Sequence, residues 1–162
     1  MILDLRKYMN KVPGVLLLSL FIFISCSREK RVVEESYPDG SPKRVCIYKG
    51  RGENRQMIRE TAYYSNGKLR MDGTYKNNKR DGKWTYWFEN GLIWSEGFFA
   101  EGKNDSIRLI NFPNGKKRYE FHYNKGVRTG KWKFYDETGR LLKEVDYSAA
   151  ATEIKKDTVS EE

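Results

Sequence analysis

A repeat of 24 residues runs through most of this 162-residue chain and constrains its fold more than any other feature. Its most regular mark is a glycine in a polar turn, followed eight residues later by an aromatic residue. Self-similarity at a short fixed period indicates a repeat architecture, in which each unit packs only on its neighbours. The glycines are Gly67, Gly91, Gly115 and Gly139, and the aromatic residues are Tyr75, Phe99, Tyr123 and Tyr147.

An earlier unit is centred on Gly40, with Tyr48 eight residues beyond it. Gly40 precedes Gly67 by 27 residues, which predicts three extra residues in the connection over 51–55. A second motif is only partly repeated: Gly82-Lys83-Trp84 recurs as Gly130-Lys131-Trp132, whereas the copy between them reads Ser106-Ile107-Arg108.

Each unit is predicted to be a β-hairpin. An Asn-Gly pair between apolar strands favours a two-residue type I′ turn, because that turn needs positive φ at both central residues. A second, looser turn follows each one, over 77–82, 101–106 and 125–130. Four to five such units predict an all-β fold, an antiparallel meander of about eight to ten strands in one open sheet that can curve.

Alternation with a period of two assigns the faces of this sheet. One face is predicted to be aromatic and the other charged, and Trp84 is expected to lie opposite Gly97 and cover its backbone. The aromatic face requires cover, by curvature, a second layer or a second protomer. Its members on the strands after the Asn-Gly turns are Leu69, Met71, Gly73, Tyr75, Ile93, Ser95, Gly97, Phe99, Tyr119, Phe121, Tyr123, Leu141, Val145 and Tyr147.

These motifs resemble the MORN repeat variant, of the kind grouped as the YwqK-type antitoxin-like family. The resemblance rests on an aromatic residue before an Asn-Gly turn, then Gly-x-(Tyr/Phe), then Gly-x-Trp, and it covers about Tyr37 to Tyr147. It implies an open β-sheet that serves as a structural, protein-binding or membrane-associated module. The antitoxin or immunity role is an alternative that the resemblance alone carries.

The N-terminus predicts export and lipid attachment. Three basic residues precede the apolar run Val15–Ile24, which is about half as long as a helix that crosses a bilayer and therefore has the length of a signal-peptide core. The run ends in Ser25-Cys26, which resembles the lipobox of bacterial lipoproteins, where the cysteine receives lipid and becomes the mature N-terminus. An ordinary cleaved signal or an uncleaved anchor is the alternative.

The predicted organisation follows from these features. Residues 1–25 are a lipoprotein signal peptide, 26–36 the lipidated Cys26 and a tether, 37–147 the repeat domain, and 148–162 a disordered tail. Ser27, which stands where Asp retains a lipoprotein at the inner membrane, favours the outer membrane of a Gram-negative bacterium.

Export changes the interpretation of the positive net charge of the chain. The formal net charge is +9, which ordinarily suggests a nucleic-acid partner. An exported protein does not meet DNA or RNA, so we expect no nucleic-acid partner. The basic residues are expected on the outer face and edges of the sheet, where they keep the protein soluble and discourage edge-to-edge pairing.

Catalytic chemistry has little support in the sequence. His122 is the only imidazole and is expected to be solvated beside Glu120 on the charged face. Cys46, the only thiol besides Cys26, is expected to be buried and structural. Motifs for phosphate binding, metal binding or metalloprotease chemistry are missing, so we expect no enzyme, no cofactor and no metal.

Binding is the remaining class of function, and two groups of residues are candidates. Trp87, Trp94 and Phe98 fall on the otherwise charged face, and a two-residue turn at Asn90-Gly91 would set Trp87 across from Trp94. Clustered exposed aromatic residues suggest a protein interface, although a pair that only stiffens one hairpin is the alternative. Lys79 and Arg80 belong to a basic cluster that suggests contact with anionic lipid or polysaccharide instead.

Overall fold

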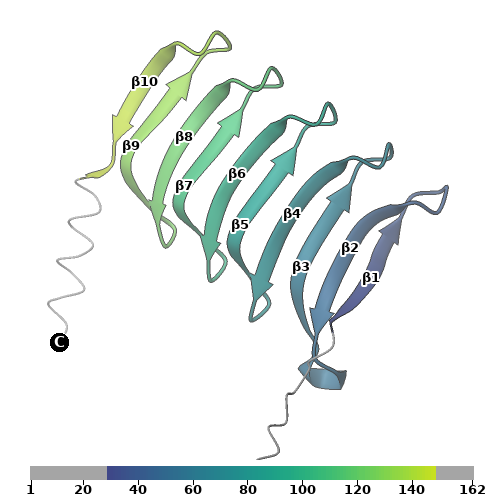
Figure 1. Cartoon of the computed structure of the whole chain (residues 1–162). Coiled ribbons are helices and arrows are strands. Elements are labelled where there is room, and N and C mark those ends of the chain that lie inside the picture. Colours follow the sequence, from purple (N-terminus) through teal and green to yellow (C-terminus); the bar gives the residue numbers. More distant parts are fainter. Residues whose placement is uncertain (1–28, 149–162) are drawn as a thin grey trace, which may run out of the picture.

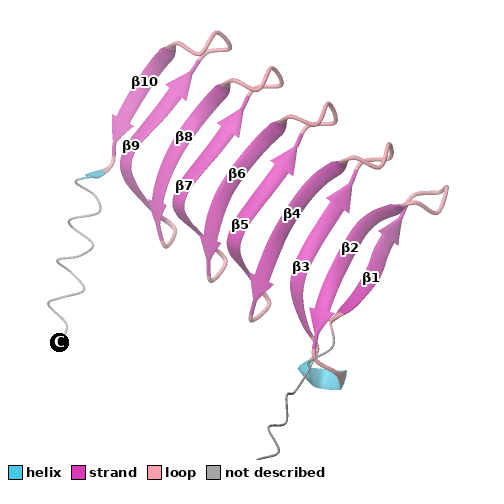
Figure 2. Ribbon diagram, in the orientation of Figure 1, coloured by secondary structure: helices cyan, strands magenta, loops and turns pink. Residues whose placement is uncertain are grey.

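The computed structural model describes residues 29–148 and shows one antiparallel sheet of ten strands (Figure 1). The strands lie in chain order, so the sheet is a pure meander, as the repeat predicts. A one-turn 3-10 helix at Gly52–Asn54 occupies the predicted insertion (Figure 2). The strands are β1 (Lys30–Ser36), β2 (Pro42–Lys49), β3 (Gln56–Tyr63), β4 (Leu69–Lys76), β5 (Lys79–Trp87), β6 (Ile93–Ala100), β7 (Lys103–Asn111), β8 (Lys117–Asn124), β9 (Val127–Tyr135) and β10 (Leu141–Asp146).

The sheet is a single layer of bowed strands with two different edges of turns (Figure 1). We call the edge that carries the connections after β1, β3, β5, β7 and β9 the Asn-Gly edge. The opposite edge, which we call the terminal edge, carries the connections after β2, β4, β6 and β8. Because β1 runs toward the Asn-Gly edge and β10 runs away from it, β1 begins and β10 ends at the terminal edge.

The predicted tether is shorter than expected. Lys30–Ser36 form β1, which pairs with β2, although their mixed charge suggested a spacer. A strand at the edge of a one-layer sheet needs no apolar face, and all but one of these residues are exposed. The predicted signal peptide, Cys26 and the tail after Ser148 lie outside the described residues.

The two kinds of turn are the reverse of the prediction. The Asn-Gly connections are three-residue loops: Gly67 N donates to Tyr64 O (3.0 Å), Tyr64 N donates to Lys68 O (2.8 Å), and only the glycine has positive φ. This is the pattern of a type I turn followed by a one-residue bulge. Asn66 keeps negative φ because its side-chain oxygen accepts a hydrogen bond from Lys68 N.

The type I′ turns lie instead at the terminal edge. Lys76 pairs with Lys79 across Asn77 and Asn78, both of which have positive φ, and Ala100 pairs with Lys103 across a similar turn. Asn77 and Asn78 adopt this conformation without glycine because the short amide side chain tolerates it. The sequence therefore located the hairpins correctly and assigned the wrong turn type to each edge.

The centre of the aromatic face is one tryptophan lying over one glycine. Trp84 pairs with Gly73 on one side and Gly97 on the other, and its ring is fully buried against Gly73. Tyr75 and Phe99 contact the ring edge-on, with centroids 5.1 and 6.0 Å away. The predicted pairing with Gly97 is confirmed, but the predicted cover of Gly97 is wrong, because the ring leans toward β4.

The middle repeat retains the backbone of the motif without its glycine. Ser106 has a φ of 57°, close to Gly130 at 58° and in the same left-handed region as Gly82 at 80°. Ser106 thus adopts a conformation that costs a residue with a Cβ atom about 1–2 kcal/mol. The motif has decayed in sequence but not in structure.

The tryptophan–glycine contact predicts an asymmetric response to added methyl groups. Gly73→Ala should lower the free energy of unfolding by about 3 kcal/mol or more, because its Cβ atom would overlap the indole ring of Trp84. Gly97→Ala is the matched control, since its Cβ atom would meet the flexible Arg108 Cγ at 3.1 Å. Urea unfolding followed by circular dichroism measures both, and equal losses would contradict this account of the contact.

The strained serine makes the opposite prediction. Ser106→Gly should raise the free energy of unfolding by about 1 kcal/mol, because glycine adopts positive φ without a steric penalty. Ser36→Gly, in a strand position with ordinary φ, should lower it instead. Thermal unfolding of the two variants gives the comparison, and a destabilised Ser106→Gly variant would show that the side chain contributes more than its strain costs.

Candidate functional site

A row of one-residue bulges borders the Asn-Gly edge and changes which residues reach the aromatic face. In each hairpin the pairing shifts by one residue just after the loop: Trp87 pairs with Ile93, but Tyr86 pairs with Ser95. Trp94 is therefore the extra, unpaired residue of a β-bulge. The bulge turns the Trp94 side chain to the aromatic face, where Tyr86 lies. The corresponding extra residues in the other hairpins are Lys43, Arg70, Arg118 and Leu142.

Contacts of the bulge residues confirm this reversal. The Trp94 ring meets Tyr86 edge-on at 6.0 Å and Phe88 at 6.2 Å, and Tyr86 in turn lies 6.3 Å from Trp84 on the aromatic face. The Arg118 guanidinium lies 4.9 Å from the ring centroid of Tyr119. The predicted pairing of Trp87 with Trp94 is wrong, because the bulge puts Ile93 opposite Trp87.

The row of bulges also places the side chain of the residue before each bulge on the charged face. Leu69 pairs with Tyr63 and lines a hollow with Arg59, Asp72 and Trp87 on the charged face. Its predicted place on the aromatic face is wrong for this reason. An apolar strip thus crosses the charged face near the Asn-Gly edge.

A shallow groove on the aromatic face is the best-formed recognition feature near this edge. Trp94 lies at its margin with 46% of its surface exposed, and Tyr64 is fixed by a hydrogen bond from its hydroxyl to Trp87 O (2.7 Å). The groove presents rigid rings beside one guanidinium, which is the composition of a protein-binding surface. Its lining residues are Tyr64, Arg70, Met71, Tyr86, Trp87 and Trp94.

The other candidate residues lie apart from this groove. Phe98 pairs with Lys83 on the charged face and is 41% exposed. Arg80 stacks on Trp84, with its guanidinium 4.3 Å from the ring centroid, so it covers the core. Lys79 lies at the terminal edge. The five predicted binding residues therefore belong to four separate places. Only Trp94 and Trp87 line the groove, where the Trp87 carbonyl accepts the Tyr64 hydroxyl.

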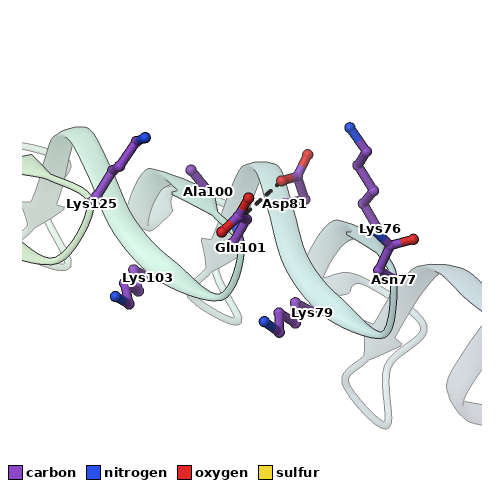
Figure 3. Close-up of a pocket in the computed structure, with 8 residues that line it drawn as sticks. All are labelled: Lys76, Asn77, Lys79, Asp81, Ala100, Glu101, Lys103 and Lys125. Carbon is purple, nitrogen blue, oxygen red and sulfur yellow. Dashed lines mark hydrogen bonds between the residues drawn. The ribbon is translucent and has the colours of Figure 1, made fainter.

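The terminal edge contains a second hollow, which is lined mainly by charged side chains (Figure 3). Asp81 accepts a hydrogen bond from Glu101 N (3.3 Å), and Asp105 accepts one from Lys125 N (2.9 Å), so each aspartate joins one turn to the next. The side chains that line this hollow are Lys76, Asn77, Lys79, Asp81, Ala100, Glu101, Lys103 and Lys125.

The remaining ionisable groups fit structural roles. Cys46 is fully buried and free, and burial raises the pKa of its thiol, as expected for a core cysteine. His122 Nε2 lies 3.4 Å from Glu120 Oε1 on the charged face, as predicted. Within residues 29–148, no group of three or more His, Cys, Asp or Glu could hold a metal ion. No helix in this described part is long and apolar enough to span a bilayer.

No sequence motif marks the bulges directly. Their only trace is Trp94, an aromatic residue on the otherwise charged parity, whereas Arg70 and Arg118 at the same repeat position fit that parity. Such an extra residue cannot be recognised until the loop length is known, because a two-residue and a three-residue loop place the same side chains on opposite faces.

Comparison with known proteins agrees with the repeat. Residues 59–77, 80–101 and 128–149 match the family model described as the MORN repeat variant. The three matches coincide with the hairpins β3–β4, β5–β6 and β9–β10. No curated protein matches the chain. The MORN-variant part of the resemblance is confirmed for these three hairpins, and the antitoxin and lipoprotein parts stay predictions.

The charge cluster around Glu120 predicts a pH dependence of stability. The hydrogen bond from Lys117 holds the pKa of Glu120 below its ordinary 4.5. The hydrogen bond with His122 and the positive charge of Lys133 lower this pKa further. Its contribution is therefore complete above pH 4.5 and is lost as the pH falls through the lower folded-state pKa. Glu120→Gln should cost about 1 kcal/mol at neutral pH and progressively less in acid.

The control for this titration is Glu137→Gln, which removes an exposed carboxylate from the Asn-Gly edge. Urea midpoints measured from pH 7 to pH 3 give the difference from wild type for each variant. A Glu120→Gln difference that stays constant across this range would show that the carboxylate is not held by its cationic neighbours.

Proposed function

We propose that this protein is a non-enzymatic, lipid-anchored component of the bacterial cell envelope whose repeat sheet binds a protein partner. The anchor would be Cys26, at the end of the apolar run Val15–Ile24, in the outer membrane of a Gram-negative organism. The three repeat matches support a repeat scaffold.

The observation that carries the binding proposal is the exposed indole of Trp94. A tryptophan that only stiffened its hairpin would lie against its neighbours with little surface left, as Trp84 does. Trp94 contacts Tyr86 and Phe88 with its edges and leaves 46% of its surface open beside the guanidinium of Arg70. Exposed tryptophan and arginine are the residues most enriched at the energetic centres of protein interfaces.

The single-layer sheet also favours protein binding over small-molecule binding. Small ligands are held in concave pockets that bury most of their surface, whereas this groove is shallow and open. A protein partner can cover the groove and the apolar residues beside it at the Asn-Gly edge. Leu92 and Leu142 are exposed there by 44% and 59%, respectively.

The proposal predicts that crosslinking in cells depends on the face of the sheet. A photo-crosslinking amino acid at position 94 of the full chain should give a discrete adduct with another protein, and one at position 98 should not. Trp94→Ala should weaken recovery of that adduct partner at least tenfold, because truncated interface tryptophans cost about 2 kcal/mol or more.

Phe98→Ala is the matched control, since Phe98 is an aromatic residue of similar exposure on the same strand but on the charged face. Arg70→Glu provides a second test that leaves the aromatic contacts intact. Adducts from both positions alike, or full partner recovery with Trp94→Ala and Arg70→Glu, would contradict a partner site in this groove.

A further inference from the structure

We infer that the terminal edge of the sheet binds the anionic lipid surface of the membrane, so that the sheet stands edge-on and its Asn-Gly edge points away. This inference rests on the lipid anchor of the proposed function. The bound chemistry is the phosphate of an anionic lipid headgroup, and the groups that bind it are lysines of the turns between successive hairpins.

Topology brings this edge to the membrane. β1 begins at Lys30, at the terminal edge, only four residues after Cys26. Four residues span at most about 14 Å, whatever conformation they adopt. An acyl chain attached at Cys26 therefore holds the β1 end of the terminal edge within about one to two Debye lengths of the bilayer surface. The Asn-Gly edge lies a full strand length farther away.

The terminal edge is also the basic edge of the described chain. Its four connections, over 49–56, 76–79, 100–103 and 124–127, contain seven basic residues and two acidic ones, Glu53 and Glu101. The five connections of the Asn-Gly edge, over 36–42, 63–69, 87–93, 111–117 and 135–141, contain four of each. A basic composition of the whole surface would not produce this difference between two edges of one sheet.

Most cations of the terminal edge are unpaired, whereas most lysines elsewhere in the described part of the chain have a partner. On the charged face, Lys83 pairs with Glu96 and Lys131 pairs with Glu144, both at 2.8 Å. At the Asn-Gly edge, Lys68 Nζ and Lys116 Nζ donate hydrogen bonds to backbone carbonyls. Outside the turns of the terminal edge, Lys30, Arg31, Arg70 and Lys143 in residues 29–148 have neither an ion pair nor a hydrogen bond. In those turns the same holds for six exposed basic side chains: Lys49, Arg51, Lys76, Lys79, Lys103 and Lys125.

The turns position these lysines for a flat anionic surface. The stem of Lys79 lies against the turn glycine Gly102, and the stem of Lys103 lies against Gly126 in the next repeat. Figure 3 shows Lys79 and Lys103 leaving the strands in one direction and Lys76 and Lys125 in the other. Ammonium groups thus flank the edge on both sides, which suits a surface that meets the sheet end-on.

The nearby acids reduce the charge of this arrangement without cancelling it. Asp81 and Asp105 accept backbone hydrogen bonds from the following turns and keep their negative charge. Together with Glu53 and Glu101 they leave the seven basic residues of this edge with a net charge of +3. Each basic residue close to an anionic membrane strengthens attachment by about fivefold, the ratio that corresponds to roughly 1 kcal/mol. A lipid chain and a basic patch together also supply the two signals that stable membrane attachment requires.

The test measures lysine protection on the lipidated full chain. Radioactive palmitate labelling of cells, with Cys26→Ser as control, first establishes the anchor. The mature protein is then reconstituted into vesicles of phosphatidylcholine, alone or mixed with phosphatidylglycerol, and treated with a water-soluble amine-acylating reagent. Mass spectrometry gives the acylation rate of each lysine.

We expect acylation of Lys76, Lys79, Lys103 and Lys125 to slow by about fivefold or more on the anionic vesicles, and the protection to disappear in high salt. Lys68 and Lys116 at the Asn-Gly edge should change by less than about twofold. The variant K76Q/K79Q/K103Q/K125Q should lose the salt-sensitive contact of the sheet with anionic vesicles. The charge-matched K68Q/K116Q/K117Q/R140Q variant should retain this contact.

The possible failures are distinguishable. If palmitate is not incorporated, the lipid anchor of the proposed function fails, and this inference fails with it. If palmitate is incorporated but the terminal-edge lysines react equally on neutral and anionic vesicles, the inference alone is overturned. Protection of these lysines in cells but not on anionic vesicles would assign the edge to a protein and would also overturn it.

Discussion

The contact of Trp84 with Gly73 is the interaction on which this single-layer sheet depends. A sheet usually buries one face against a second layer, and none is present among residues 29–148. Here a large ring lies flat on the bare backbone of the neighbouring strand, and its Nε1 donates to Thr74 O at 3.0 Å. Arg80 covers the outer side of the ring. Glycine is required at this position because only its absent side chain leaves room for an indole within one layer. Trp132 repeats the hydrogen bond, to His122 O, two periods later, but there the ring packs on Phe121, with centroids 4.3 Å apart, and not on a glycine.

The middle repeat shows how the device changes without breaking the sheet. Arg108 stands where Trp84 and Trp132 stand in the other repeats, and its stem covers Gly97. Asn104 replaces the arginine that stacks on tryptophan elsewhere, and its side-chain oxygen accepts a hydrogen bond from Arg108 (2.9 Å). The two positions thus differ together in this repeat: an arginine stands at the tryptophan position, and an asparagine stands at the arginine position. This substitution explains why the β7–β8 hairpin keeps its geometry and yet lies outside the three matched segments.

The sequence predicted the features that follow from the 24-residue period. It did not predict the features that depend on whether a loop has two residues or three. The hairpins, their order, the aromatic face around Trp84 and the buried Cys46 all follow from spacing, and all are confirmed. The candidate site did not follow, because a three-residue loop at Asn90-Gly91 requires a bulge, and the bulge turns Trp94 away from Trp87 and toward Tyr86. β1 was missed for a related reason: an exposed edge strand carries no apolar pattern to recognise.

The same difference in turn type separates the roles of the two edges. In the three-residue loops of the Asn-Gly edge, Asn90 and Asn114 donate side-chain hydrogen bonds to carbonyls of the next loop, at 3.0 Å each, and Lys116 adds another. Polar side chains at this edge form hydrogen bonds that join one repeat to the next. Exposed rings such as Trp94 do not take part in these hydrogen bonds. At the terminal edge the connection is made by backbone, from Gly102 N to Arg80 O and from Gly126 N to Asn104 O, with an aspartate at each step. The ammonium groups of Lys76, Lys79, Lys103 and Lys125 in those turns have no ion pair or hydrogen bond. A repeat that differs in loop length between its two ends therefore exposes aromatic rings at one edge and unpaired ammonium groups at the other.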